Sequence, residues 1–171
     1  MHIMEKTIFA SVIALLFAGC GNAQKVDNTP IAVLDLNRYL GDWYEIARFD
    51  HSFERGLEFC EANYALREDG KIAVTNTGIK EGKNKTSKGK VKTTDTPALL
   101  RVSFFGPFYS DYRVMLLDTE YQWALIGSGS AKYLWILSRT PELAQETLDT
   151  ILAEALRRGY DTSKLIWVKQ K

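Results

Sequence analysis

The stretch Gly41-Asp42-Trp43-Tyr44-Glu45 opens the first strand-like run of the chain and decides how the remainder is interpreted. One residue separates the glycine from the tryptophan, and apolar and polar residues then mix as far as Phe49. A turn followed by a strand that buries a large aromatic ring produces this pattern. The pattern alone does not determine which kind of sheet the strand joins. That has to be inferred from the sequence that follows it.

Seven further strand-like runs follow, separated by turn residues such as Glu68-Asp69-Gly70 and Gly106-Pro107. Many short strands in succession indicate an all-β, antiparallel sheet closed on itself. An eight-stranded barrel has an interior wide enough for one small ligand. The expected strands are Trp43–Asp50, Phe59–Arg67, Lys71–Lys80, Thr86–Thr94, Leu99–Phe105, Tyr109–Leu117, Tyr121–Gly127 and Tyr133–Ser138.

A single helix is predicted after these strands. Thr140 can cap it, Pro141 suits its first position, and Gly159 suits the residue after its end. Its apolar stripe most simply packs on the outside of the barrel, and a partner-binding helix is the alternative. Leu165–Val168 then reads as a short last strand at the sheet edge. The stripe consists of Leu148, Ile151, Leu152, Ala155 and Leu156.

The order of the strands predicts a contact between two distant residues. In an up-and-down meander each turn reverses the chain, so the end of the eighth strand returns to the end where the first began. Trp43 and Arg139 stand at these two positions. A guanidinium over an indole ring is a favourable cation–π contact, and we expect this pair to form it.

These features together resemble the lipocalins, whose first motif has the spacing of Gly41 and Trp43 and whose third motif contains the arginine at 139. The second motif, Thr-Asp-Tyr, is matched by Thr119-Glu120-Tyr121, with glutamate in place of aspartate. The resemblance implies an eight-stranded antiparallel up-and-down barrel with one C-terminal helix packed outside. It also implies that all three motifs are structural and lie at the closed end.

A closer similarity, over about residues 36–169, is to the bacterial outer-membrane lipocalins. It is carried by the stretches at 43–49, 102–109 and 133–141. These proteins bind fatty acids and lysophospholipids and have proposed roles in maintaining the envelope under stress. Strand alternation, with the resemblance to the more distant apolipoprotein D, gives the expected ligand-pocket residues. They are Tyr64, Asn76, Val102, Phe104, Tyr112, Trp135 and Leu137.

The N-terminal region is expected to be a processing and anchoring segment. Residues 1–19 contain an apolar run too short to span a bilayer, which is typical of a secretory signal. Phe17-Ala18-Gly19-Cys20 resembles a bacterial lipobox with Phe in place of the usual Leu, so we expect a lipid on Cys20; a plain secretion signal is the alternative. Residues 20–35 would then be the anchor and a polar tether, and 36–171 the barrel domain. By the same resemblance Gly21 favours the outer membrane, facing the periplasm.

Two features are expected at the open end of the barrel. Lysines at 80, 83, 85, 88, 90 and 92 surround the link before the fourth strand. They are explained either as a solvated face that discourages aggregation or as a site that attracts anionic lipid head groups. Phe105, Pro107 and Phe108 stand in the link between the fifth and sixth strands. If exposed, they suggest membrane contact or a homodimer interface; otherwise they fold over the rim.

Charge and chemistry exclude several classes. The formal net charge of +1 gives no field that points to nucleic acid. His51 is the only histidine after the leader, so the sequence offers few residues for a histidine metal cluster or a Ser-His-Asp triad. Cys60 would be the only free thiol and is expected to be a small buried hydrophobe. No catalytic residue, metal or cofactor is predicted.

The sequence therefore predicts a non-enzymatic lipoprotein that holds a fatty acid or lysophospholipid in a barrel calyx. The first alternative is a structural envelope lipoprotein with a filled barrel and a protein partner. A weaker one is an isomerase of this fold that uses Cys60.

Overall fold

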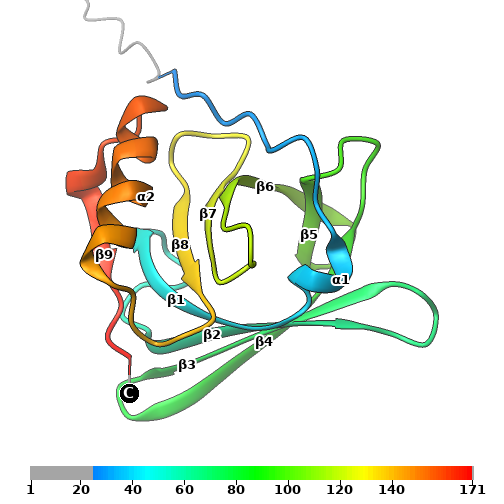
Figure 1. Ribbon diagram of the computed structural model, residues 1–171. Helices are drawn as coiled ribbons and strands as arrows, with labels where there is room; N and C mark the ends of the chain where they lie inside the picture. Colours follow the sequence, from blue (N-terminus) through cyan, green and yellow to red (C-terminus); the bar gives the residue numbers. More distant parts are fainter. Residues whose placement is uncertain (1–24, 171) are drawn as a thin grey trace, which may run out of the picture.

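The structure is a computed structural model that describes residues 25–170 (Figure 1). The predicted signal and Cys20 lie outside these residues. The elements, in chain order, are α1 (Leu36–Tyr39), β1 (Gly41–Phe49), β2 (Glu58–Leu66), β3 (Ile72–Lys80), β4 (Lys83–Lys92), β5 (Leu99–Phe105), β6 (Phe108–Leu117), β7 (Trp123–Gly127), β8 (Leu134–Ser138), α2 (Gln145–Arg157), the 3-10 turn η1 (Thr162–Lys164) and β9 (Leu165–Trp167).

The strands form one antiparallel sheet in the order β2-β3-β4-β5-β6-β7-β8-β1-β9. A further pairing of β1 with β2, in which Trp43 lies opposite Ala62, closes the sheet into a barrel. β1 has a bulge between Glu45 and Ala47 where it pairs with β8. The predicted eight-stranded up-and-down barrel is confirmed, and β9 pairs with β1 at Ala47–Phe49, beyond the stretch of β1 that pairs with β2.

The apolar residues form two separate cores because each strand alternates between the two faces of the wall. The inner core fills the closed half of the barrel and includes Trp43, Tyr39 and Leu100. The outer core lies between the wall and α2, which runs along the outside of the barrel as predicted (Figure 1). Ile151 and Ala155 of α2 are buried in it, but Leu156, expected in the same stripe, is 56% exposed.

Several element boundaries differ from the prediction. α2 begins at Gln145 after the uncapped Ala144, not at Thr140-Pro141. The Thr140 hydroxyl donates to the Glu142 carbonyl instead and forms a turn before the helix. The predicted end is confirmed, since Gly159 follows the helix with φ +87°.

β7 begins at Trp123 and not at Tyr121. The side chain of Asp118 accepts hydrogen bonds from the backbone N–H groups of Glu120 and Gln122 and builds a turn there. β4 begins at Lys83 and not near Thr86, because Glu81 and Gly82 form a tight turn with positive φ.

Residues 25–35, predicted to belong to a tether, are instead docked on the barrel; we call them the strap. The Ile31 N–H donates to the Val114 carbonyl over 2.9 Å, and the Asn28 amide donates to the Ser128 carbonyl over 2.7 Å. The strap crosses the outside of the wall from the end of α2 to α1 (Figure 1). The part of the predicted tether before Lys25 lies outside the described residues.

Candidate ligand-binding site

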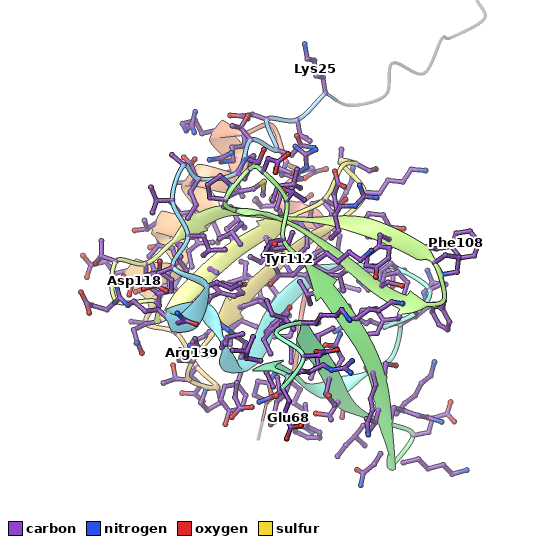
Figure 2. All side chains as sticks on the ribbon, turned by 90° about the vertical axis from the view of Figure 1, so that its right-hand side faces the viewer. Lys25, Glu68, Phe108, Tyr112, Asp118 and Arg139 are labelled. Atoms are coloured by element: carbon purple, nitrogen blue, oxygen red, sulfur yellow. The ribbon has the colours of Figure 1, made fainter. Side chains whose placement is uncertain are left out.

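The barrel has one closed and one open end. Figure 2 views it from the side, with Asp118 and Arg139 at one end and Phe108 at the other. α1 and the β6–β7 turn lie at the closed end, whereas the β1–β2, β3–β4, β5–β6 and β7–β8 links lie at the open end because alternate turns of a meander share an end.

Arg139 ties the closed end together. Its guanidinium carbon lies 3.8 Å from the centroid of the Trp43 ring, which is the contact that counting strands predicts. Nη1 donates to the Asp42 carbonyl over 2.7 Å, and Nη2 donates to the carbonyls of Arg38 and Leu40, each over 2.9 Å. One side chain thus holds α1, β1 and β8 together.

The other predicted motif residues lie around this contact. Gly41 has φ +95°, and a Cβ there would stand 3.4 Å from Arg139 Nη1. The Tyr121 hydroxyl accepts from the Asp35 N–H over 2.9 Å, and the Thr119 carbonyl accepts from Arg38. These residues plug one end of the barrel and leave the other end as the route to the interior.

Three tyrosines meet above this floor. The hydroxyls of Tyr39 and Tyr112 are 2.6 Å apart, and the Tyr64 ring centroid lies 6.0 Å from that of Tyr112. Burial raises the pKa of all three hydroxyls above the usual value, so they remain protonated at neutral pH. Their hydroxyl groups form a polar surface deep in the barrel, within an otherwise apolar wall.

The predicted pocket residues do converge on the barrel interior. Tyr64 and Leu137 belong to the inner core, and Val102, Phe104, Tyr112 and Trp135 pack against it while remaining partly exposed. Asn76 lies opposite Ala62 in the same inward register, and its buried Oδ1 has no hydrogen-bond partner among the described residues. Of these, Val102, Phe104 and Trp135 are on the mouth side, where solvent reaches the interior, whereas Tyr112 lies deeper, beside Tyr39.

A hollow of about 280 Å³ opens at the mouth. Tyr133 and Trp135 form one wall, with their rings nearly parallel at 7° and 5.8 Å between centroids. Phe53, from the β1–β2 link, also lines the hollow, with its ring centroid 6.2 Å from that of Tyr133. Ser110, Asp111, Ser128, Gly129 and Ser130 complete the lining.

A buried charged cluster beneath the β1–β2 link was not predicted. The Arg48 guanidinium, 2% exposed, donates through Nη1 to Glu45 Oε1 over 2.6 Å and through Nη2 to the Glu54 carbonyl over 2.8 Å. The indole N–H of Trp135 donates to Glu54 Oε2 over 3.0 Å. Nε2 of His51 lies 2.8 Å from the same oxygen but outside hydrogen-bond geometry. The available signal was the pair of charges in β1. The bulge after Glu45, which brings Arg48 onto the same inward face as Glu45, is invisible in the sequence.

This cluster sets the ionisation of its members. Burial, with repulsion from the Glu54 carboxylate, raises the pKa of Glu45 to about 8, against the opposing effect of Arg48. Burial likewise raises the pKa of the Cys60 thiol to about 12. A thiol that holds its proton so strongly is a poor nucleophile, which leaves the reactive-cysteine alternative without support. Within residues 25–170 no group of three or more His, Cys, Asp or Glu side chains could hold a metal ion.

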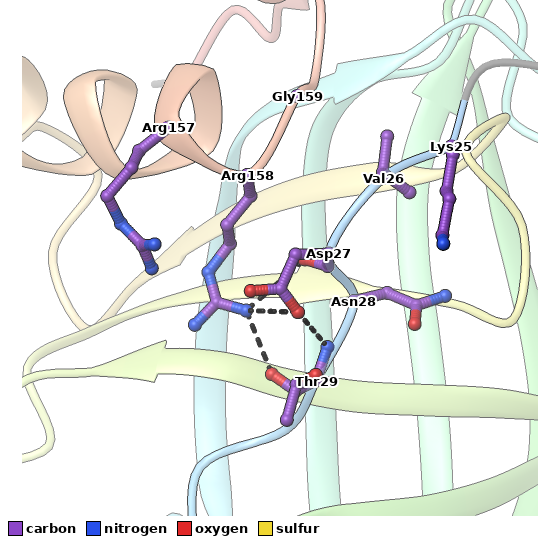
Figure 3. Close-up of a pocket in the computed structure, with 8 residues that line it drawn as sticks. All are labelled: Lys25, Val26, Asp27, Asn28, Thr29, Arg157, Arg158 and Gly159. Carbon is purple, nitrogen blue, oxygen red and sulfur yellow. Dashed lines mark hydrogen bonds and ion pairs between the residues drawn. The ribbon is translucent and has the colours of Figure 1, made fainter.

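A larger hollow, of about 530 Å³, lies outside the barrel between the strap and the end of α2 (Figure 3). Arg158 crosses it and donates to the Thr29 carbonyl over 2.9 Å, while the Asp27 N–H donates to the Arg158 carbonyl over 2.8 Å. Arg158 and Asp27 are thus occupied in docking the strap, and none of the residues that line this hollow belongs to the inner core.

Known proteins share this architecture and much of this sequence. The chain is 48% identical over 168 residues to the outer membrane lipoprotein Blc of Escherichia coli K12, covering 95% of each chain. It is 38% identical to temperature-induced lipocalin-1 of Arabidopsis thaliana, covering 83% of this chain and 82% of that one. Insecticyanin from the tobacco hornworm Manduca sexta has the same fold, with a TM-score of 0.70 at 21% identity, over 88% of this chain and 87% of that one. A family profile, the lipocalin-like domain, matches residues 34–170, and the chain is therefore a member of the lipocalin family.

Proposed function

We propose that this lipocalin binds the acyl chain of a fatty acid or lysophospholipid in the mouth half of its barrel. The observation that carries the proposal is the set of inward-facing apolar side chains that stay partly exposed around the mouth. Val102, Phe104 and Trp135 offer apolar surface that water reaches and that no other part of the described chain covers. Lipocalins hold small hydrophobic ligands, so these residues are the expected contact surface.

The driving force is burial of hydrocarbon. Each CH₂ group that leaves water for such a surface contributes about 0.8 kcal/mol. The tyrosines and the floor fill the closed half, so the chain of the ligand occupies the mouth half and its head group remains at the rim. A vacant hydrogen-bond acceptor at Asn76 Oδ1 suits a water or a ligand donor at the inner limit of that space.

Relatives and the N-terminal sequence support a proposal for the cellular setting. The relatives from Escherichia coli and Vibrio cholerae are named outer membrane lipoproteins. With a lipid on Cys20, this protein would be held at the outer membrane facing the periplasm and would serve envelope maintenance by carrying lipids. No helix in the described part of the chain is long and apolar enough to cross a bilayer.

The binding is non-enzymatic in this proposal, since the buried thiol and the lone His51 offer no catalytic pair. Native mass spectrometry of protein purified without detergent tests it. A co-purifying mass that releases a fatty acid or lysophospholipid is the expected result. Bare protein that also fails to take up added oleate would contradict the proposal and favour a filled barrel with a protein partner.

A further inference from the structure

We infer that the open end of the barrel is a docking surface for an anionic lipid bilayer, with the β5–β6 turn entering the lipid and the β3–β4 hairpin binding phosphate head groups. This inference concerns the outside of the rim and stands whether or not the calyx holds a lipid. It also differs from anchoring through Cys20, which would fix the protein to a membrane without orienting the barrel.

The first observation is a pair of aromatic rings that point away from the protein. Phe105 and Phe108 face each other across the β5–β6 turn, and their side chains are 78% and 79% exposed. Phe108 projects beyond the ribbon at the open end (Figure 2). Scattered exposed apolar residues are ordinary on protein surfaces, but adjacent ones at a functional rim mark an interaction site.

The turn that carries these rings has a defined backbone conformation held by a hydrogen bond. Gly106 adopts φ +54°, and the Ser103 hydroxyl donates to the Gly106 carbonyl over 3.2 Å. Ser103 is itself buried. The backbone is therefore held in a shape that leaves both phenylalanines in solvent, although folding them over the mouth would bury them. Phe53, 61% exposed in the β1–β2 link, adds a third ring at the same end.

The second observation is an unneutralised row of positive charge beside the turn. β4 contains five lysines and no acidic residue, and all five side chains are exposed. No lysine of β4 belongs to an ion pair among the described residues, whereas Lys71 and Lys164, elsewhere on the surface, each pair with an aspartate. The nearest charge of opposite sign in sequence is Glu81, in the β3–β4 turn.

The register of β4 places part of this charge over the mouth. Lys85 lies opposite Gly78, whose position faces Cys60 inside the barrel, so Lys85 is in the inward register at the rim. β4 pairs with β5 only from Lys90 to Lys92, which leaves the tip of the β3–β4 hairpin standing free of the barrel wall. These side chains can reach a planar surface in front of the mouth.

The two features adjoin each other. The ammonium groups of Lys90 and Lys92 lie over the Tyr109 ring, 5.6 and 4.4 Å from its centroid, and Tyr109 follows Phe108 directly. Rings that enter the acyl region beside lysines that bind head groups are the pattern of interfacial attachment. Because the lysines lack carboxylate partners, the surface complements a negative bilayer better than a second copy of this chain, which would place two lysine rows together.

Binding to vesicles tests this inference. The protein is the chain from residue 20 with Cys20→Ser, which has no acyl anchor and keeps every contact described between residues 25 and 170. Co-sedimentation is measured with vesicles of phosphatidylcholine alone and with 30 mol% phosphatidylglycerol at two salt concentrations. The expected result is binding to the anionic vesicles that weakens with added salt.

Matched variants separate the rim from the rest of the surface. F105S/F108S and K83Q/K85Q are each expected to lower the partition coefficient about tenfold. L66S and K71Q, which remove an exposed leucine (58%) and an exposed lysine at the closed end, are expected to change it less than twofold. All six substituted positions are exposed, and near-ultraviolet circular dichroism checks that each variant is folded.

Two results would overturn the inference. One is an absence of vesicle binding by the parent protein. In that case sedimentation equilibrium is measured, and a parent dimer that F105S/F108S converts to a monomer would assign the rim to self-association. The other is an equal loss of binding in the rim and closed-end variants. A displacement assay with a fluorescent fatty acid, done without vesicles, reports calyx binding separately, and the rim variants are expected to retain it.

Discussion

The guanidinium of Arg139, at the end of β8, covers the indole ring of Trp43, near the start of β1, at 3.8 Å. This contact joins the first and eighth strands of the barrel and closes one end of it. It makes the opposite end the route to the interior, which is where we propose the ligand site.

Replacing Arg139 by lysine should destabilise the protein by about 3 kcal/mol, because the ammonium group cannot serve the Asp42, Arg38 and Leu40 carbonyls together and leaves acceptors unpaired. Urea unfolding measures the difference. Arg157→Lys is the control: that arginine is exposed and pairs only with Glu154, so the change should stay within about 0.5 kcal/mol. Equal losses in the two variants would show that the closed end does not depend on Arg139.

Stability should fall as pH rises from about 5 to 8 through the buried Glu45. Its carboxyl has an ordinary pKa in the unfolded chain and a pKa of about 8 in the folded protein. The folded state therefore holds a proton that the unfolded state has released, and its advantage is lost as pH approaches 8. Glu154, whose pKa is lowered to about 2 by its hydrogen bonds with Arg157 and Arg158, contributes equally throughout this range.

Urea unfolding at pH 5, 6.5 and 8 checks this dependence. Glu45→Gln keeps the size of the side chain and removes its titration, so its profile should be flatter by an amount on the order of a few kcal/mol. The groups around Glu45 are Arg48, Glu54, His51 and Cys60, and His51→Gln separates the contribution of the imidazole. A profile in E45Q that matches the parent protein would assign the pH dependence to another group.

Ile151→Ala should cost about 2–4 kcal/mol, since Ile151 is fully buried between α2 and the barrel wall. Leu156→Ala, on the same helix, should change stability by less than about 0.5 kcal/mol, because that side chain is 56% exposed. Thermal unfolding of both variants is the measurement. Similar losses would mean that α2 buries a different face.

Gly89→Ala should destabilise the barrel by about 1–3 kcal/mol, because a Cβ would stand 2.7 Å from the Ser103 carbonyl oxygen and 2.9 Å from the Phe104 ring. The backbone oxygen cannot move without disturbing the short β4–β5 pairing. Lys88→Ala, at the adjacent exposed position, is the control, and its urea midpoint should match that of the parent protein. A Gly89→Ala protein of unchanged stability would indicate that β4 and β5 are farther apart.

The sequence predicted the architecture well, because an up-and-down barrel depends on local signals. Turn residues such as Asp69-Gly70 mark each reversal, and counting reversals was enough to bring Trp43 and Arg139 together. The inward positions of Tyr64, Val102 and Trp135 followed from strand alternation and family resemblance.

What the sequence could not show depends on contacts between distant segments. The strap looked like a tether because its polar residues find partners, such as the Ser128 carbonyl, only in the folded barrel. The start of α2 was misplaced because Thr140 and Pro141 have the residue types of a helix start but form a turn. The Glu45–Arg48 pair was missed because residues three apart in a regular strand face opposite sides, and a single bulge after Glu45 brings Arg48 onto the inward face that Glu45 shares with Trp43.

Displacement of a fluorescent fatty acid by oleate measures whether the mouth half of the barrel holds an acyl chain. Val102→Phe adds a ring at a partly exposed inward position, and Ala65→Phe adds one at an exposed outward position of β2. We expect that the parent protein and A65F bind the probe alike, that oleate displaces it, and that V102F binds at least tenfold more weakly while remaining folded. Equal affinities for V102F and A65F, or no binding by the parent protein, would contradict it.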